Sequence, residues 1–157
     1  PVAVYVGRIA IEKNLRAFLD MPWDGDKLIV GDGPDRPRLE SRYKDAHFVG
    51  AHKGTDLAAY YRCGDVFVFP SKTDTFGMVL IEAMACGLPI AGYNVTGPKD
   101  IITESFLGAV DDDLETAAKN ALECGSQEQR VTYAKANYSW PHAAHEFMQA
   151  LIDSFKR

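Results

Sequence analysis

The sequence has few cysteines and histidines, and none is arranged as a metal site or a disulfide framework. Cys63, Cys86 and Cys124 are widely spaced and form no Cys-x-x-Cys pair. His142 and His145 are three residues apart, but no acidic or cysteine partner stands near them at ligand spacing, which favours packing or surface roles. We therefore expect no metal and no cofactor, and a reducing, cytoplasmic compartment.

Long apolar runs and runs of one charge are also missing. No stretch approaches the roughly 20 apolar residues of a transmembrane helix, and no signal-peptide pattern is visible. The 17 Lys and Arg residues do not cluster, and the net charge of −5 argues against nucleic acid as a partner. No Gly-x-Ser-x-Gly motif occurs, and no Ser-His-Asp or Cys-His set can be built from spacing.

What is present is a regular alternation of strand and helix patterns within one domain of 157 residues. The expected strands are residues 2–6, 27–30, 47–49, 65–69 and 88–92, with a candidate sixth at 107–110; the expected helices between them are 14–21, 36–44, 55–62 (capped by Thr55 or Asp56), 78–86 and 98–103. The spacing is typical of βαβ units, and continuous apolar strands belong to parallel sheets covered on both faces. We predict a doubly wound, Rossmann-like α/β fold whose ligands bind beyond the carboxyl ends of the strands.

The C-terminal part of the sequence is predicted to be helical. Asp112 or Asp113 can cap a helix over residues 114–122, a second helix is expected at 126–137, and Ser139 can cap a last one. The abrupt start at Pro1, inside a strand pattern and without an initiator Met, indicates a fragment of a longer chain.

Residues 71–89 form the stretch on which the functional argument depends. Its helix has no polar face, which predicts burial all round, and Gly87 followed by Pro89 ends it. Glu82 is the only charge in this helix. An unpaired buried carboxylate is costly, so we expect Glu82 to have a partner, and we expect that partner to be largely a ligand.

The start of the same helix is a candidate anion site. Backbone N–H groups at a helix N-terminus, together with the helix dipole, attract anions. Thr75 and Phe76 precede Gly77, which lets a ligand approach the backbone closely. The alternative is that Gly77 only makes a tight turn and that Asp74 is a helix cap.

Two further loops follow expected strands. Arg8 and Lys13 flank the first helix start, where an anion would neutralise them; the alternative is that both point to solvent. The Gly31-Asp-Gly33 segment lacks the third glycine of a dinucleotide fingerprint, so we expect it to form a turn.

Taken together, these motifs resemble the C-terminal, donor-binding domain of retaining glycosyltransferases of family 4 (group 1 type), which forms one half of a GT-B fold. The resemblance covers essentially the whole chain and rests on four landmarks in order: Gly7-Arg8-Ile9 with Lys13-Asn14, Gly31-Asp32-Gly33-Pro34, Phe48-Val49-Gly50, and the segment from Pro70 to Pro89. Tyr138-Ser139-Trp140 resembles the start of a helix, here 138–157, that crosses back toward the N-terminal domain.

The resemblance implies roles for specific residues. The family has two Glu separated by seven residues; here the pair is Asp74 and Glu82, so the first member is shortened. Glu82 would bind the nucleotide ribose and Asp74 the transferred sugar. Arg8 and Lys13, beside Gly7, would bind the diphosphate and stabilise the leaving group. The backbone of Thr75, Phe76, Gly77, Met78 and Val79 would contact diphosphate and sugar, and the loop from His52 to Gly54 would lie along the base.

The implied activity is sugar transfer from a nucleoside-diphosphate sugar, without metal and with retention of configuration. The acceptor, a saccharide, a lipid or a small molecule, would bind mainly to a missing N-terminal domain, so this fragment alone is expected to be inactive. Any peripheral association with the inner membrane face would also rest on that half. Three alternatives remain: a nucleotide-sugar 2-epimerase, a non-catalytic sugar-nucleotide binding module, and a doubly wound domain with no sugar role, such as a flavodoxin-like regulator, which leaves Glu82 unexplained.

Overall fold

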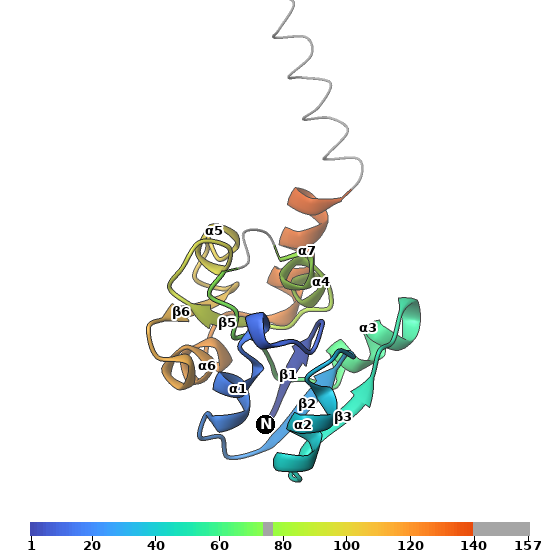
Figure 1. The fold of residues 1–157 in the computed structure, drawn as a ribbon. Helices are drawn as coiled ribbons and strands as arrows, with labels where there is room; N and C mark the ends of the chain where they lie inside the picture. The colour runs from blue at the N-terminus through green and yellow to red at the C-terminus, as the bar shows by residue number, and fades with distance from the viewer. Residues whose placement is uncertain (74–76, 140–157) are drawn as a thin grey trace, which may run out of the picture.

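The computed structural model, which describes residues 1–73 and 77–139, contains a six-stranded sheet in which every pairing is parallel (Figure 1). The strands are β1 (Val2–Val6), β2 (Asp26–Val30), β3 (Ala46–Gly50), β4 (Val66–Phe69), β5 (Ile90–Tyr93) and β6 (Gly108–Asp111). Their spatial order is β3-β2-β1-β4-β5-β6. This is the doubly wound order, and it confirms the predicted fold class, including the sixth strand.

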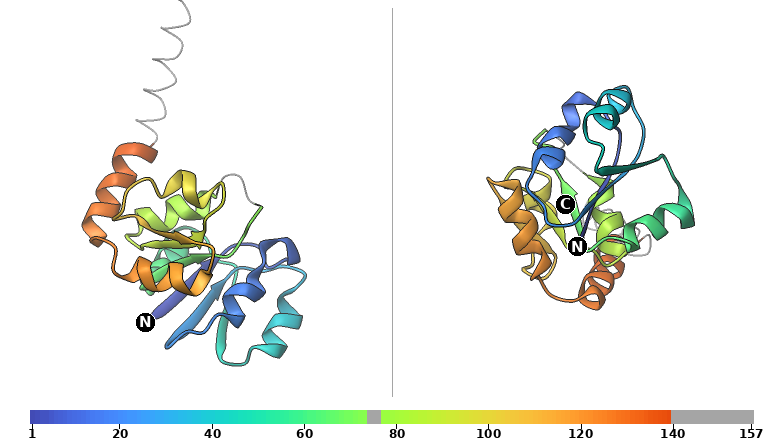
Figure 2. Two further views of the ribbon diagram at one scale, coloured as in Figure 1. Left: turned by 90° about the vertical axis from the view of Figure 1, so that its left-hand side faces the viewer. Right: turned by 90° about the horizontal axis from the view of Figure 1, so that it is seen from below.

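Helices cover both faces of the sheet (Figures 1 and 2). One face carries α1 (Leu15–Asp20), α2 (Arg36–Arg42) and α6 (Leu114–Leu122); the other carries α3 (Gly54–Arg62), α4 (Met78–Ala85), α5 (Pro98–Ile101) and α7 (Gln127–Tyr138). Along β1, Ala3 and Tyr5 pack into the first core, and Val4 and Val6 into the second. Side chains of a strand alternate between faces, so an apolar run supplies both cores at once. No helix in the described part of the chain is long and apolar enough to span a bilayer.

The predicted helix cap at Asp113 is confirmed, a further cap is found at Ser126, and the cap predicted for the helix that follows β3 is absent. The Asp113 carboxylate accepts a hydrogen bond from the N–H of Thr116, and Ser126 forms a full capping box at the start of α7. The cap expected at Thr55 or Asp56 is wrong, because α3 already begins at Gly54 with no side-chain cap. The last predicted helix, begun by Ser139, lies outside the described residues.

Helix α4 ends as predicted but is not buried all round. Gly87 has a φ of 89°, and the N–H of Leu88 bonds the carbonyl of Ala83 at 3.0 Å. This Schellman-type end suits glycine, which adopts a positive φ without strain. Met78, however, is 60% exposed, and Glu82 is only partly buried. The apolar sequence of α4 therefore does not mean that the helix is fully buried. The exposed Met78 lines a surface cleft.

Arg130 of α7 is a buried cation held by main-chain oxygens. Its guanidinium donates to the carbonyls of Gly87 (2.7 Å), Phe106 (3.0 Å) and Cys124 (2.6 Å). Gly87 and Cys124 follow the last turns of α4 and α6, where the helix dipole favours a positive charge. Only 6% of Arg130 is exposed. This residue therefore fixes the far end of α4 against α7 and the α6–α7 connection.

Replacing Arg130 tests that role. Arg130→Met keeps the apolar stem and leaves one buried and two partly buried carbonyls without this donor, so we expect the free energy of unfolding in urea to fall by about 2–4 kcal/mol. The matched control is Lys135→Met, an exposed position on the same helix, for which we expect a change within about 0.5 kcal/mol. Equal stability of the two variants would contradict the assigned role.

Candidate functional site

A cleft of about 440 Å³ opens at the carboxyl ends of β1 and β4. These strands are neighbours in the sheet, at the point where the strand order reverses, which is the usual ligand site of doubly wound folds. The cleft is lined by Tyr5, Val6, Gly7, Arg8, Glu12, Lys13, Phe69, Ser71, Gly77, Met78 and Val79. Six predicted site residues (Gly7, Arg8, Lys13, Gly77, Met78 and Val79) are thus brought together from two segments far apart in the sequence.

The cation-bearing loop after β1 is held at both ends. The hydroxyl of Tyr5 donates to the carbonyl of Arg8 at 2.8 Å. At the other end Asn14 adopts a left-handed conformation with a φ of 54°, and its side-chain amide donates to the carbonyl of Pro70 at 3.0 Å. The Arg8 guanidinium itself is 3.9 Å from the Glu12 carboxylate and its side chain is 65% exposed. The loop backbone is therefore fixed, while the Arg8 head group is available to an incoming anion.

The N-terminus of α4 forms the opposite wall of the cleft. Gly77 precedes the helix with no side-chain cap, and the first turn contains no acidic residue. A helix leaves its first N–H groups without intrahelical acceptors, and no carboxylate of that turn offsets the positive end of the dipole. Together with Arg8 and Lys13 across the cleft, this wall favours a ligand with closely spaced negative charges.

Ser71 was not predicted to be a site residue. It is only 2% exposed, it lines the cleft, and its hydroxyl accepts a bond from the N–H of Thr73 at 3.4 Å. The signal that could have identified it is its place directly after β4 and Pro70, since loops at this edge of the sheet carry the ligand contacts.

Glu82 has one partner within the protein, and the expected ligand partner stays a prediction. The hydroxyl of Tyr61, on α3, donates to Glu82 Oε2 at 2.8 Å. Tyr61 is 1% exposed; burial, and next the hydrogen bond to Glu82, raise the pKa of its phenol well above the ordinary value. Glu82 does not line the cleft, but it lies one turn along α4 from Met78, which does.

A second cavity of about 280 Å³ adjoins the cleft and shares Val6, Gly7 and Arg8 with it. Its other lining residues are Val30, Gly31, Asp32, Ala51, His52 and Leu57. Within the predicted loop from His52 to Gly54, His52 lines the second cavity, whereas Gly54 lines neither of these two cavities and instead begins α3.

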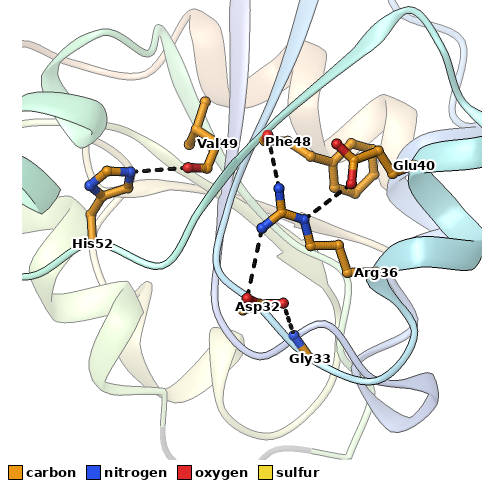
Figure 3. Close-up of polar contacts among 7 residues, drawn as sticks. All are labelled: Asp32, Gly33, Arg36, Glu40, Phe48, Val49 and His52. Carbon is orange, nitrogen blue, oxygen red and sulfur yellow. Dashed lines mark hydrogen bonds and ion pairs between the residues drawn. The ribbon is translucent and has the colours of Figure 1, made fainter.

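Polar contacts fix the rim of this second cavity (Figure 3). The Arg36 guanidinium lies between Asp32 (3.8 Å), Glu40 (3.2 Å) and the carbonyl of Phe48 (3.4 Å). The His52 ring nitrogen Nε2 is 3.1 Å from the carbonyl of Val49. Arg36 therefore ties α2 to β3 and to the loop that carries Asp32.

Gly31 and Gly33 do more than form the expected turn. A Cβ on Gly31 would lie 1.9 Å from the carbonyl oxygen of Gly7, and one on Gly33 would lie 2.2 Å from that of Ile9. The N–H groups of Gly7 and Ile9 bond the carbonyls of Val30 and Asp32. The two glycines let the loops after β1 and β2 lie directly against each other.

Three of the predicted residues, Asp74, Thr75 and Phe76, lie outside the described part of the chain. Across residues 1–73 and 77–139, no group of three or more His, Cys, Asp or Glu side chains is placed to hold a metal ion.

A family model described as "Glycosyl transferases group 1" matches residues 1–124. The GDP-mannose-dependent alpha-mannosyltransferase of Mycobacterium tuberculosis (strain CDC 1551 / Oshkosh) is 42% identical over 148 residues, which is 93% of this chain and 35% of that protein. Sulfoquinovosyl transferase SQD2 of Arabidopsis thaliana is 38% identical over 113 residues, 69% of this chain and 22% of that protein. The chain thus spans about a third or less of these relatives.

Solved structures show the same fold. The lipopolysaccharide outer core galactosyltransferase WaaB in its apo form matches with a TM-score of 0.81 at 18% identity, over 98% of this chain and 49% of that chain. Anabaena HepE in complex with UDP-glucose matches with a TM-score of 0.71 at 17% identity, over 97% of this chain and 48% of that chain. In both cases this chain corresponds to about half of a longer protein.

Asn14 offers a test of how the cleft is assembled. Asn14→Gly removes the bond to Pro70 but tolerates the positive φ, so we expect a loss of about 1 kcal/mol in the free energy of unfolding. Asn14→Ala adds the cost of a left-handed residue with a Cβ, about 1 kcal/mol more. Urea denaturation of the wild type and both variants measures these differences. Wild-type stability of Asn14→Gly would argue against a stabilising bond to Pro70, and equal stability of the two variants would argue against a cost of the positive φ.

Proposed function

Because this chain belongs to the group 1 glycosyl transferases, we propose that it is the donor-binding half of a retaining, metal-independent glycosyltransferase. Its donor is a nucleoside-diphosphate sugar. The observation that carries the proposal is the cleft at the β1–β4 switch point, where Arg8, Lys13 and the first turn of α4 line one cavity. Two cationic side chains facing a helix N-terminus suit a diphosphate better than any neutral ligand.

We assign the base, the ribose and the sugar of the donor to features that neighbour the cleft. The second cavity shares the Arg8 wall with the cleft, so a nucleotide whose diphosphate lies in the cleft can extend its base toward Asp32 and His52. We assign Glu82, one turn along α4 from the cleft, to the ribose that joins base and diphosphate. Asp74, together with the backbone of Thr75 and Phe76, is assigned to the transferred sugar on the strength of the family resemblance.

The chemistry follows from where charge develops. As the bond between the sugar and the diphosphate breaks, negative charge grows on the departing phosphate oxygens. Cations and hydrogen-bond donors of the protein that are already in place stabilise this charge more in the transition state than in the ground state. Arg8 supplies a fork of N–H donors and Lys13 a point charge, while the backbone N–H groups of Gly77, Met78 and Val79 add oriented dipoles.

The acceptor site belongs to the part of the protein that this chain does not span. A saccharide, a lipid or a small molecule would bind mainly to the facing N-terminal domain, which residues 138–157 would cross toward. Any peripheral attachment to a membrane would also rest on that domain. The chain alone is therefore expected to bind donor weakly and to transfer nothing.

Calorimetric titration with UDP, GDP and ADP sugars tests donor binding directly. Losing a charge-assisted hydrogen bond costs about 1.5–3 kcal/mol, so Arg8→Ala and Lys13→Ala should each weaken binding by roughly tenfold or more. Arg16→Ala is the matched control, because Arg16 is exposed on α1, pairs with Asp20 and lines neither cavity. A folded wild-type chain that binds none of these sugar nucleotides would overturn the proposal.

Asp74 is tested in the full-length protein. If its carboxylate contacts the transferred sugar, Asp74→Ala should lower turnover by roughly tenfold to a hundredfold, the equivalent of about 1.5–3 kcal/mol. The affinity for the nucleoside diphosphate without sugar should stay within about twofold, since that ligand lacks the contacted group. Unchanged turnover would contradict the contact between Asp74 and the transferred sugar.

A further inference from the structure

We propose that Tyr61 is a positioning residue that orients the Glu82 carboxylate for the hydroxyls of a nucleotide ribose. This inference rests on the proposed function and adds to it a residue from α3. Apart from Tyr61, α3 contributes only Leu57, which lines the second cavity. It also explains why a phenol deep in the core is joined to a charged group.

The first step is the packing of Tyr61. Its ring lies against that of Phe67 on β4, with centroids 5.7 Å apart and planes tilted by 50°. The side chain is 1% exposed, so its position is set by the core and not by solvent. A buried phenol needs an acceptor, and the Val79 carbonyl is 3.4 Å away, whereas Glu82 Oε2 is at 2.8 Å. The carboxylate is therefore the main acceptor.

The second step concerns the kind of donor. Tyr61 is neutral and has one proton to give, whereas a carboxylate has about four acceptor positions. In the described residues no Lys or Arg forms an ion pair with Glu82, and no other hydrogen bond to its carboxylate is present. Tyr61 thus fixes the carboxylate while leaving its charge and most of its acceptor capacity. This combination suits two neighbouring ribose hydroxyls, each of which can donate to one carboxylate oxygen.

The third step is location. Residues four apart on a helix share a face. On α4, Glu82 is four residues from Met78, which lines the cleft. On α3, Tyr61 is four residues from Leu57, which lines the second cavity. The Tyr61–Glu82 pair therefore lies one turn from both cavities. In a nucleotide the ribose lies between the diphosphate and the base, so a diphosphate in the cleft and a base in the second cavity would bring the ribose close to this pair.

The test compares nucleotides with and without ribose hydroxyls. Using the nucleoside diphosphate that the wild-type chain binds best among UDP, GDP and ADP, we expect Tyr61→Phe to raise Kd by about tenfold. With the 2′,3′-dideoxy form of the same nucleotide, the wild type and Tyr61→Phe should bind within twofold of each other. Tyr133→Phe is the matched control: its hydroxyl pairs with Thr103 and it lines neither cavity, so both ligands should bind it as they bind the wild type.

A second variant separates positioning from a general loss of structure. In a Glu82→Gln background, Tyr61→Phe should add less than a twofold change in Kd, because the group on which it acts has already lost its charge. If Tyr61→Phe leaves both affinities unchanged, or weakens ribose and dideoxy nucleotides equally, the positioning role is wrong while donor binding stands. If the wild type binds no nucleotide, the proposed function fails, and this inference fails with it.

Discussion

The parallel pairing of β1 with β4 is the constraint on which the rest of the structure depends. It places the ends of two strands side by side although they lie more than sixty positions apart, Ala3 opposite Val66 and Val4 opposite Phe67. The connection that leaves β1 turns toward β2, and the one that leaves β4 turns toward β5. A crevice must open between them. The loops with Arg8 and Lys13 and the start of α4 become neighbours for that reason alone.

The backbone around the crevice is assembled by close contacts that a side chain would prevent. Gly31 and Gly33 admit the carbonyls of Gly7 and Ile9 at distances no Cβ tolerates, and Asn14 joins the same loop to Pro70. Arg130 fixes the other end of α4. Backbone N–H groups and cations held in this way need little reorganisation when a ligand arrives. This is the condition for effective electrostatic stabilisation of developing charge.

Most of the fold could be predicted from the sequence, because parallel strands buried on both faces appear as short apolar runs, and the first four strands end at or directly before glycine or proline. The first loop and the start of α4 could be predicted to meet, since both follow strands. Glu82 could be singled out as a charge in an apolar helix, but its partner could not be identified. Tyr61 is 21 positions away on another helix, and only the packing of α3 brings the two together. The burial of α4 was overestimated for a related reason: Met78 faces a cleft, and apolar character does not distinguish a cleft from a core.

Glu82 and Arg8 also differ in how far solvent reaches them. Arg8 is largely exposed, so dissolved ions screen its attraction for a ligand within a Debye length of roughly 8 Å at physiological ionic strength. The bond between Tyr61 and Glu82 joins a neutral, buried donor to its acceptor and is little affected by added salt. If the proposed donor binds as assigned, ionic strength acts unequally on its two ends: added salt weakens the attraction of Arg8 for the diphosphate and leaves the orientation of Glu82 toward the ribose nearly unchanged.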